Sequence, residues 1–301
     1  MRTERNTQIE IPKLGSICML CQKKPPIKNS HLFPKFVGRW LKDTGTAYFR
    51  AATTPNRREE DTTRLPMLCS DCESLFSGWE SKFAERVFRP FQEDKSSFLK
   101  FDYSNWFANF VISISWRVLA ATIDGLEERE PTAYVPVANA FEEWRLYLLG
   151  ISNRIRPYHH QLFFFTSLTD KPNDLKLPSR YHSYLLRSVD GTLVYSGHKV
   201  YVYSLLAGIC IWSPISPPIA TGWPKGSHVF EKGCFKVGQH VQDPVWGPWT
   251  IKRAEEAFSL PLSAKQQTKV NESFEKLLRE KQPEDVERAL EAMLYDWRWR
   301  Q

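Results

Sequence analysis

Apolar side chains recur at helical spacing after the second of two cysteine pairs near the N-terminus. With charged residues between them, they predict a helix whose apolar stripe faces a core. The members of this stripe are Leu75, Phe76, Trp79, Phe83, Val87, Phe88 and Phe91. The preceding stretch 44–63 is polar and basic and predicts a long loop or loose hairpin, while residues 1–15 have the pattern of a loose arm. We assign residues 1–95 to a first unit.

The next segment, 96–168, also has a helical pattern. Residues 106–123 carry apolar side chains over a wide face, which predicts a buried helix that ends at Gly125. Residues 134–150 form a second such stretch, with Gly150 where a helix stop is expected. We expect this segment to be a helical connector.

From residue 161 to about residue 249, short apolar runs alternate with turn residues. The runs predict antiparallel strands at 162–165, 183–188, 191–195, 200–206 and 208–212, with a hairpin turn at Asp190-Gly191. We assign residues 169–258 to an antiparallel β-rich domain. Four tryptophans in it either line a pocket or fill a core, and a core is the default. They are Trp212, Trp223, Trp246 and Trp249.

The last segment, 259–301, returns to a helical pattern. Ser263 is placed to cap a helix that runs to about Lys281, and Pro283 begins another that reaches Trp299. The fold class expected for the whole chain is therefore α+β. Its parts are an N-terminal unit, a helical connector, an antiparallel β domain and C-terminal helices.

Composition agrees with two or three packed units. The chain has 301 residues, of which 42% are hydrophobic and 14% aromatic, which is too apolar for a disordered protein. The apolar stretches 107–116 and 201–215 fall short of the roughly 18–20 residues that a spanning helix needs. The first 13 residues are polar, unlike a signal peptide. We expect a cytoplasmic protein with no membrane association.

The net charge of +7 lies entirely in the first 65 residues, which hold 13 Lys and Arg against 6 Asp and Glu. A basic region of this kind fits a polyanionic partner such as nucleic acid, because binding releases counterions from the phosphates. The alternative is an ordinary solvated surface.

Two CxxC pairs, Cys18/Cys21 and Cys69/Cys72, predict one structural zinc ion. Two intervening residues let one turn direct both sulfurs at the same ion, and four thiolates complete a tetrahedral shell. Thioredoxin-type redox chemistry uses one such pair and would leave the other unexplained. We expect Cys210, like Cys234, to be an ordinary thiol.

The residues around these pairs resemble the zinc-containing branch of the HNH (ββα-metal) nucleases. The chain reads Cys18-Met19-Leu20-Cys21, then Asn29-Ser30-His31-Leu32-Phe33-Pro34, then Leu68-Cys69-Ser70-Asp71-Cys72-Glu73. In that family a CxxC precedes a strand that ends in an acidic residue, a histidine, two apolar residues and a proline. A Leu-Cys-x-x-Cys-His or Leu-Cys-x-x-Cys-Asn then opens the helix. The resemblance covers about residues 16–92 and implies a treble-clef fold.

The resemblance also implies catalytic roles for His31 and Glu73. His31 matches the general base that activates water for attack on a phosphodiester, beside Mg²⁺ or Mn²⁺. Glu73 stands where the family often has a metal-ligating histidine, and a carboxylate suits a hard cation. Ser30 replaces the family's acidic ligand, and Arg64 lies near the position of its central asparagine. Candidates to replace that asparagine are Asn29, Asn56 and Asp61.

Other interpretations of these residues stay open. His31 could brace the hairpin, or contact DNA without cleaving it. Glu73 could stabilise the first helical turn through the helix dipole. Glu80, seven residues further on, either joins a metal site or is a solvated charge.

Basic side chains around His31 form a candidate nucleic-acid surface that would hold the phosphate backbone. We assign Lys28, Lys35, Arg39, Arg57, Arg58 and Arg64 to it. Phe36 and Trp40, which lie between them, fit a core better than base stacking.

The leading function is a metal-dependent HNH-type endonuclease that hydrolyses phosphodiester bonds of nucleic acid, with DNA as the expected substrate. The family resemblance suggests a role in bacterial defence. The alternative is a non-catalytic zinc module that binds nucleic acid or acts as a regulator. A third interpretation is a structural protein whose zinc unit anchors the larger C-terminal region.

Overall fold

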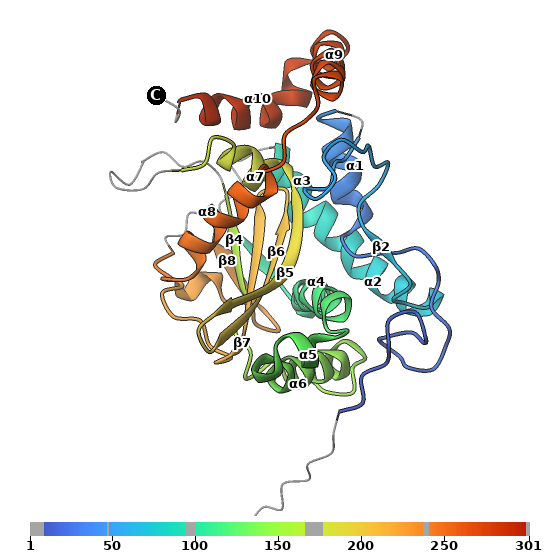
Figure 1. Ribbon diagram of the computed structural model, residues 1–301. Coiled ribbons are helices and arrows are strands. Elements are labelled where there is room, and N and C mark those ends of the chain that lie inside the picture. The colour runs from blue at the N-terminus through green and yellow to red at the C-terminus, as the bar shows by residue number, and fades with distance from the viewer. Residues whose placement is uncertain (1–8, 47, 94–99, 166–176, 237–240, 299–301) are drawn as a thin grey trace, which may run out of the picture.

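The computed structural model describes residues 9–46, 48–93, 100–165, 177–236 and 241–298 (Figure 1). At its centre is a four-stranded antiparallel sheet in the order β4-β7-β6-β5. The strands are β4 (Gln161–Phe164), β5 (Val189–Ser196), β6 (Lys199–Leu206) and β7 (Ile209–Ser216). Helices lie on both sides of the sheet, so the fold is mixed α+β with antiparallel sheets.

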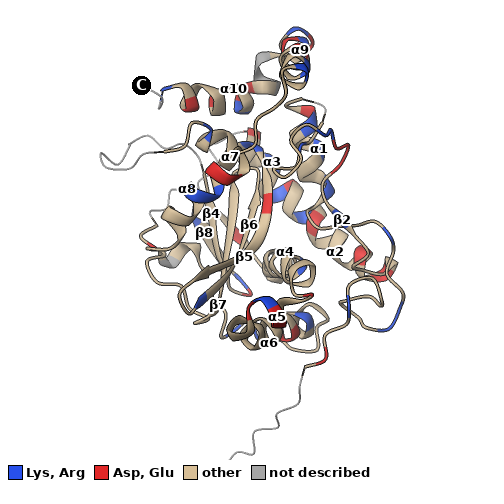
Figure 2. Cartoon of the chain, viewed as in Figure 1, with Lys and Arg blue, Asp and Glu red and all other residues tan. Residues whose placement is uncertain are grey.

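The central strands β6 and β7 are buried on both faces. On β6, Val200 and Val202 belong to one hydrophobic cluster, whereas Tyr201 and Tyr203 belong to another. Alternate side chains of a strand point to opposite faces, so an almost continuous apolar run follows from burial on both sides. Lys199 is the one charged residue in the two strands, and the middle of the sheet carries little charge (Figure 2).

Helix α4 (Asn105–Thr122) packs against one face of this sheet, and α8 (Trp246–Ala257) lies on the other side (Figure 1). Helix α6 (Pro131–Leu148) packs on α4, and the short α5 (Leu126–Arg129) joins them. The Trp116 and Phe141 rings stack at this helix contact, with centroids 5.3 Å apart. The two helices expected within 96–168 are confirmed.

The N-terminal unit has a two-stranded antiparallel pair, β1 (Ser30–His31) with β2 (Arg64–Leu65). Helix α1 (Lys35–Asp43), which the sequence pattern did not predict, follows β1. The long loop expected at 44–63 contains an isolated bridge between Phe49 and Glu59. The predicted helix after the second cysteine pair is present as α2 (Ser70–Phe83), a π-helical turn (Ala84–Phe88) and α3 (Arg89–Glu93).

One hydrophobic cluster runs through the N-terminal unit, α4, α6 and the sheet. Phe83 of α2 stacks on Phe110 of α4, with centroids 3.8 Å apart. Gly191 of β5 lies close to α4 and to the N-terminal unit, since a Cβ there would lie 2.7 Å from Val118 and 3.0 Å from Phe33. The predicted boundaries at residues 95 and 168 lie outside the described residues, and the division into four units stays a prediction.

The hairpin turn expected at Asp190-Gly191 is wrong. Both residues lie inside β5, opposite Leu205 and Ser204 of β6, and the chain reverses between β5 and β6 at Gly197-His198. The Asp190 carboxylate accepts hydrogen bonds from Arg253 at 2.7 and 2.9 Å. Asp190 is therefore held by a partly buried ion pair, and Gly191 allows a close approach to α4, although the two residues together usually mark a turn.

The strand expected at 183–188 is also wrong, because residues 183–187 belong to helix α7 (Tyr181–Arg187), which Ser188 follows. Further on, α8 occupies the end of the predicted β-rich domain. The other strand of this region, β8 (Gly233–Lys236), pairs with β3 (Lys100–Tyr103) from the predicted helical connector. The region 169–258 is thus more mixed than its sequence pattern indicates.

Two C-terminal helices, α9 (Ala264–Glu280) and α10 (Pro283–Arg298), are present as expected. Ser263 caps α9, accepting a hydrogen bond from the Gln266 amide at 3.4 Å. Trp299 and the first eight residues of the predicted arm lie outside the described residues. Within the described part of the chain, no helix has the length and apolar character needed to cross a membrane.

Candidate metal centre and the neighbouring histidine

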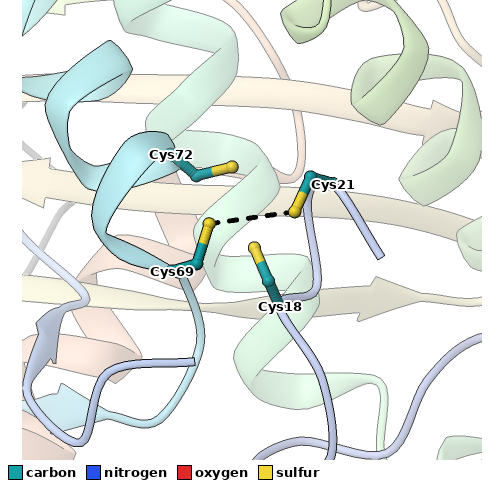
Figure 3. Close-up of side chains that lie close together, drawn as sticks. All are labelled: Cys18, Cys21, Cys69 and Cys72. Atoms are coloured by element: carbon teal, nitrogen blue, oxygen red, sulfur yellow. Dashed lines mark hydrogen bonds between the residues drawn. The ribbon is translucent and has the colours of Figure 1, made fainter. Parts of the chain in front are cut away.

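The four predicted cysteines converge on one point. Their sulfur atoms all lie within 4.8 Å of one another, and the Cys21 and Cys69 sulfurs are 3.8 Å apart (Figure 3). Four sulfurs placed tetrahedrally at about 2.3 Å from a zinc ion would be separated by about 3.8 Å. The cluster could therefore hold a metal such as zinc.

Backbone hydrogen bonds bring the two cysteine pairs together. The Cys18 amide donates to Lys24 O at 2.8 Å, which closes the first turn. The Met19 amide then donates to Met67 O at 2.9 Å, beside the second pair. Cys69 and Cys72 sit at the beginning of α2, where the chain turns into the helix. A metal ion would thus link the turn that holds Cys18 and Cys21 to the N-terminal turn of α2.

Cys18 and Cys72 shift each other's pKa because their thiols are hydrogen-bonded. A hydrogen bond from Cys72 lowers the pKa of Cys18, although burial acts in the opposite direction. The same hydrogen bond, together with burial, raises the pKa of Cys72. Four adjacent thiolates repel one another unless a cation neutralises them, so the cluster suits a divalent ion.

His31 is paired with Asp61 on the hairpin between the two cysteine pairs. The His31 Nε2 and Asp61 Oδ2 atoms are 3.0 Å apart, and Arg64 also donates to this carboxylate. Burial alone would raise the pKa of Asp61, but the hydrogen bonds from His31 and Arg64 outweigh it and lower the pKa to about 2. Asp61 thus remains ionised beside the imidazole.

Of the three residues considered as replacements for the family's asparagine, Asp61 is the one that contacts His31. The Asn56 side chain instead accepts a hydrogen bond from the Ser263 amide at 2.7 Å, close to the start of α9. Asn29 is exposed. The pairing of β1 with β2 places His31 opposite Arg64. Asp61, three residues before Arg64, therefore lies close to the histidine.

Ser30 is fully buried and binds the backbone. Its hydroxyl accepts a hydrogen bond from the Leu68 amide at 2.9 Å, which ties β1 to the approach of the second cysteine pair. Ser30 therefore makes a structural contact at this position.

An ion pair between a buried arginine and a partly buried glutamate lies next to the histidine backbone. Arg117 of α4 donates to Glu80 at 2.6 Å and to the backbone oxygen of His31 at 3.2 Å. Glu80 is thus the ion-pair partner of Arg117 and not a freely solvated charge. The sequence pattern did not indicate Arg117, since it lies in an apolar helix far along the chain and only its burial reveals the contact.

Glu73 lies in the first turn of α2, where its charge faces the positive end of the helix dipole. One of its carboxylate oxygens, Oε1, is buried and lacks a hydrogen-bond partner among the described residues. A buried carboxylate oxygen without a donor is costly, and a bound cation would compensate it. Within the described residues, however, the four cysteines are the one convergent group of three or more metal-binding side chains.

The predicted basic surface divides into two sets. Lys28, Lys35 and Arg39 are exposed. The remaining three, Arg57, Arg58 and Arg64, make contacts within the chain, although Arg57 and Arg64 are also exposed. Arg57 pairs with Glu59 at 3.0 Å, Arg58 lies over the Tyr48 ring at 4.7 Å, and Arg64 pairs with Asp61.

The other singled-out residues are structural. Trp223, Trp246 and Trp249 pack against the hydrophobic cluster that contains Trp212 and Tyr203, as the default core interpretation has it. Cys210 is buried there, and burial raises its pKa to about 12. An open pocket of about 570 Å³ lies elsewhere, between residues 53–57 and Leu260-Pro261.

Searches of known protein families, characterised proteins and solved structures give no match to this chain. Evidence about function therefore comes from the geometry of the cysteine cluster and its neighbouring histidine.

Proposed function

We propose that the chain is a metal-dependent endonuclease of HNH type, with a treble-clef unit around a structural zinc ion. The observation that carries the proposal is the His31–Asp61 pair, which lies on the hairpin between the two cysteine pairs. A knuckle, a hairpin and a helix that begins at the second pair form the order typical of this family.

The chemistry assigned to His31 is general-base catalysis. The Asp61 carboxylate binds one ring nitrogen at 3.0 Å, so it can fix the imidazole tautomer and stabilise the imidazolium formed when water is deprotonated. The hydroxide then attacks the phosphorus atom, and the leaving oxygen departs with a proton from solvent. His31 is the proposed catalytic residue and Asp61 the residue that positions it.

A hard divalent cation, Mg²⁺ or Mn²⁺, would stabilise charge on the phosphate, and Glu73 is its proposed protein ligand. The buried Oε1 atom of Glu73 supports this assignment. Such ions commonly take one or two carboxylates and complete their shell with water and substrate phosphate. The exposed Lys28, Lys35 and Arg39 would contact the phosphate backbone, with DNA as the expected substrate.

Plasmid nicking tests the proposal. Zinc-loaded wild type should convert supercoiled plasmid to nicked or linear DNA in Mg²⁺ or Mn²⁺. His31→Ala should lower the rate by at least about 100-fold, because a general base contributes about 10²–10⁴. Asp61→Asn should cause a smaller loss, since an amide cannot stabilise the imidazolium as well.

The matched control is His198→Ala, which removes an exposed histidine from the β5–β6 turn and should leave the rate unchanged. Equal zinc content in all samples must be shown first. The proposal fails if zinc-loaded wild type leaves duplex DNA, single strands and RNA intact.

A second candidate is a non-catalytic zinc module that binds nucleic acid. The buried position of His31, with its side chain 9% exposed, favours this alternative, as does the structural contact of Ser30. This module would bind DNA in a salt-sensitive manner, and His31→Ala would retain the binding. A binding assay beside the nicking assay separates the two functions.

A further inference from the structure

Helix α10 carries a row of large apolar side chains that are open to solvent. Their exposed fractions are 37% for Leu290, 50% for Met293, 47% for Leu294 and 58% for Trp297. A spacing of three and four residues places them along one face of the helix. Single exposed apolar residues are common, but a contiguous row indicates an interaction surface.

The opposite face of α10 is already used to hold the helix on the molecule. Val286 and Ala292 are buried there. The Tyr295 ring stacks on His182 of α7 with centroids 5.1 Å apart, and Asp296 accepts a hydrogen bond from the His182 amide at 2.8 Å. The exposed row therefore faces away from the body, and α10 lies at the outer edge of the molecule (Figure 1).

Charge along the exposed face changes from acidic to basic. Glu287 is exposed one turn before Leu290, and Arg298 is exposed directly after Trp297. Figure 2 shows acidic residues along α10 and a basic one at its C-terminal end. The face is thus an apolar row with opposite charges at its two ends.

Two copies of this face are complementary when their helices run antiparallel. If two such helices pack antiparallel with the two-fold axis between Met293 and Leu294, each Leu290 meets a Trp297 of the other copy. Each Arg298 then lies about half a helical turn from the level of the opposing Glu287, within reach of a long side chain. Parallel packing would instead bring like charges together.

We propose that the exposed face of α10 is a homodimer interface, in which α10 packs antiparallel on the same helix of a second copy. The contact is isologous, because the same residues serve both copies. This inference does not depend on the function of the zinc unit.

Sedimentation velocity between about 1 and 100 μM tests the interface. Wild type should shift from monomer to dimer across this range. Leu294→Glu should raise the dissociation constant at least about tenfold, because it places a charge at the centre of the contact. Ile151→Glu is the matched control, since Ile151 is 69% exposed elsewhere, and it should dimerise like wild type. Circular dichroism checks that both variants are folded.

Charge exchange tests the antiparallel orientation. Glu287→Lys and Arg298→Glu should each weaken the dimer, and the double variant should restore it towards wild type. The proposal is overturned if wild type remains monomeric at every concentration, even if the helix then binds lipid vesicles. It is also overturned if Leu294→Glu dimerises normally, or if the double variant is weaker than either single one.

Discussion

A single buried guanidinium connects the candidate site to the core. Arg117 contacts Glu80 on α2, the His31 backbone on β1 and Ser113 on its own helix. Its side chain is 2% exposed, so removing one partner leaves a charge in a poorly solvated place. The position of His31 therefore depends on a residue of the helical connector.

Arg117→Met should lower the free energy of unfolding by about 3 kcal/mol, since breaking a buried ion pair leaves Glu80 uncompensated. Urea denaturation at fixed zinc concentration measures the change. Arg39→Met, which alters an exposed arginine of α1, should change stability by less than about 0.5 kcal/mol. A loss below 1 kcal/mol for Arg117→Met would show that the pair contributes little.

Thiol reactivity distinguishes the six cysteines. Cys234 is exposed, whereas Cys210 is buried with its pKa raised to about 12, so little of the reactive thiolate exists at neutral pH. In zinc-loaded protein a thiol reagent should modify one cysteine rapidly, and Cys234→Ser should abolish that phase. Adding a chelator should release four more reactive thiols. Rapid reaction of several thiols before chelation would argue against a metal-filled cluster.

At the scale of elements, long regular patterns were predictable and tertiary contacts were not. The stripe on α2 and the apolar face of α4 follow from helical spacing alone. The run at 183–188 resembles a strand because α7 has only seven residues, too few for helical spacing to show. Asp296, far along the chain, accepts hydrogen bonds from the amides of His182 and Ser183 and thereby caps α7.

The candidate site was likewise predictable only where its residues follow a regular spacing along the chain. The cysteine spacing predicted a cluster, which the structure brings together. The contact of His31 with Asp61 could not be derived, because it depends on how a long loop returns to pair Arg64 with His31.

Asp296→Ala should release α10 from α7. The variant leaves two amides of the first turn of α7 without an acceptor, which costs about 1 kcal/mol or more. Hydrogen exchange should become faster in both α7 and α10, while the amides of β6 and β7 remain protected. Glu287→Ala, at an exposed position of the same helix, should leave α7 unchanged. Unaltered protection of α7 in Asp296→Ala would show that the cap is dispensable.

At the scale of the whole molecule, Gly191 lies where the hairpin, α4 and the sheet meet. Gly191→Ala would place a methyl group 2.7 Å from Val118 and 3.0 Å from Phe33, so the surroundings must shift. We expect a loss of about 1–3 kcal/mol. Thermal denaturation of zinc-loaded protein measures it. The control, Gly78→Ala, has open space around the new methyl group on α2 and should be neutral or slightly stabilising.

The continuous hydrophobic cluster has a consequence for the amount of this protein in a cell. The four cysteines, α4 and the sheet contribute to one hydrophobic core. Losing the metal would therefore expose apolar surface well beyond the N-terminal quarter. Proteases continuously remove chains that spend more time unfolded. During zinc starvation we therefore expect the entire polypeptide to be degraded faster, so that its abundance follows the zinc supply.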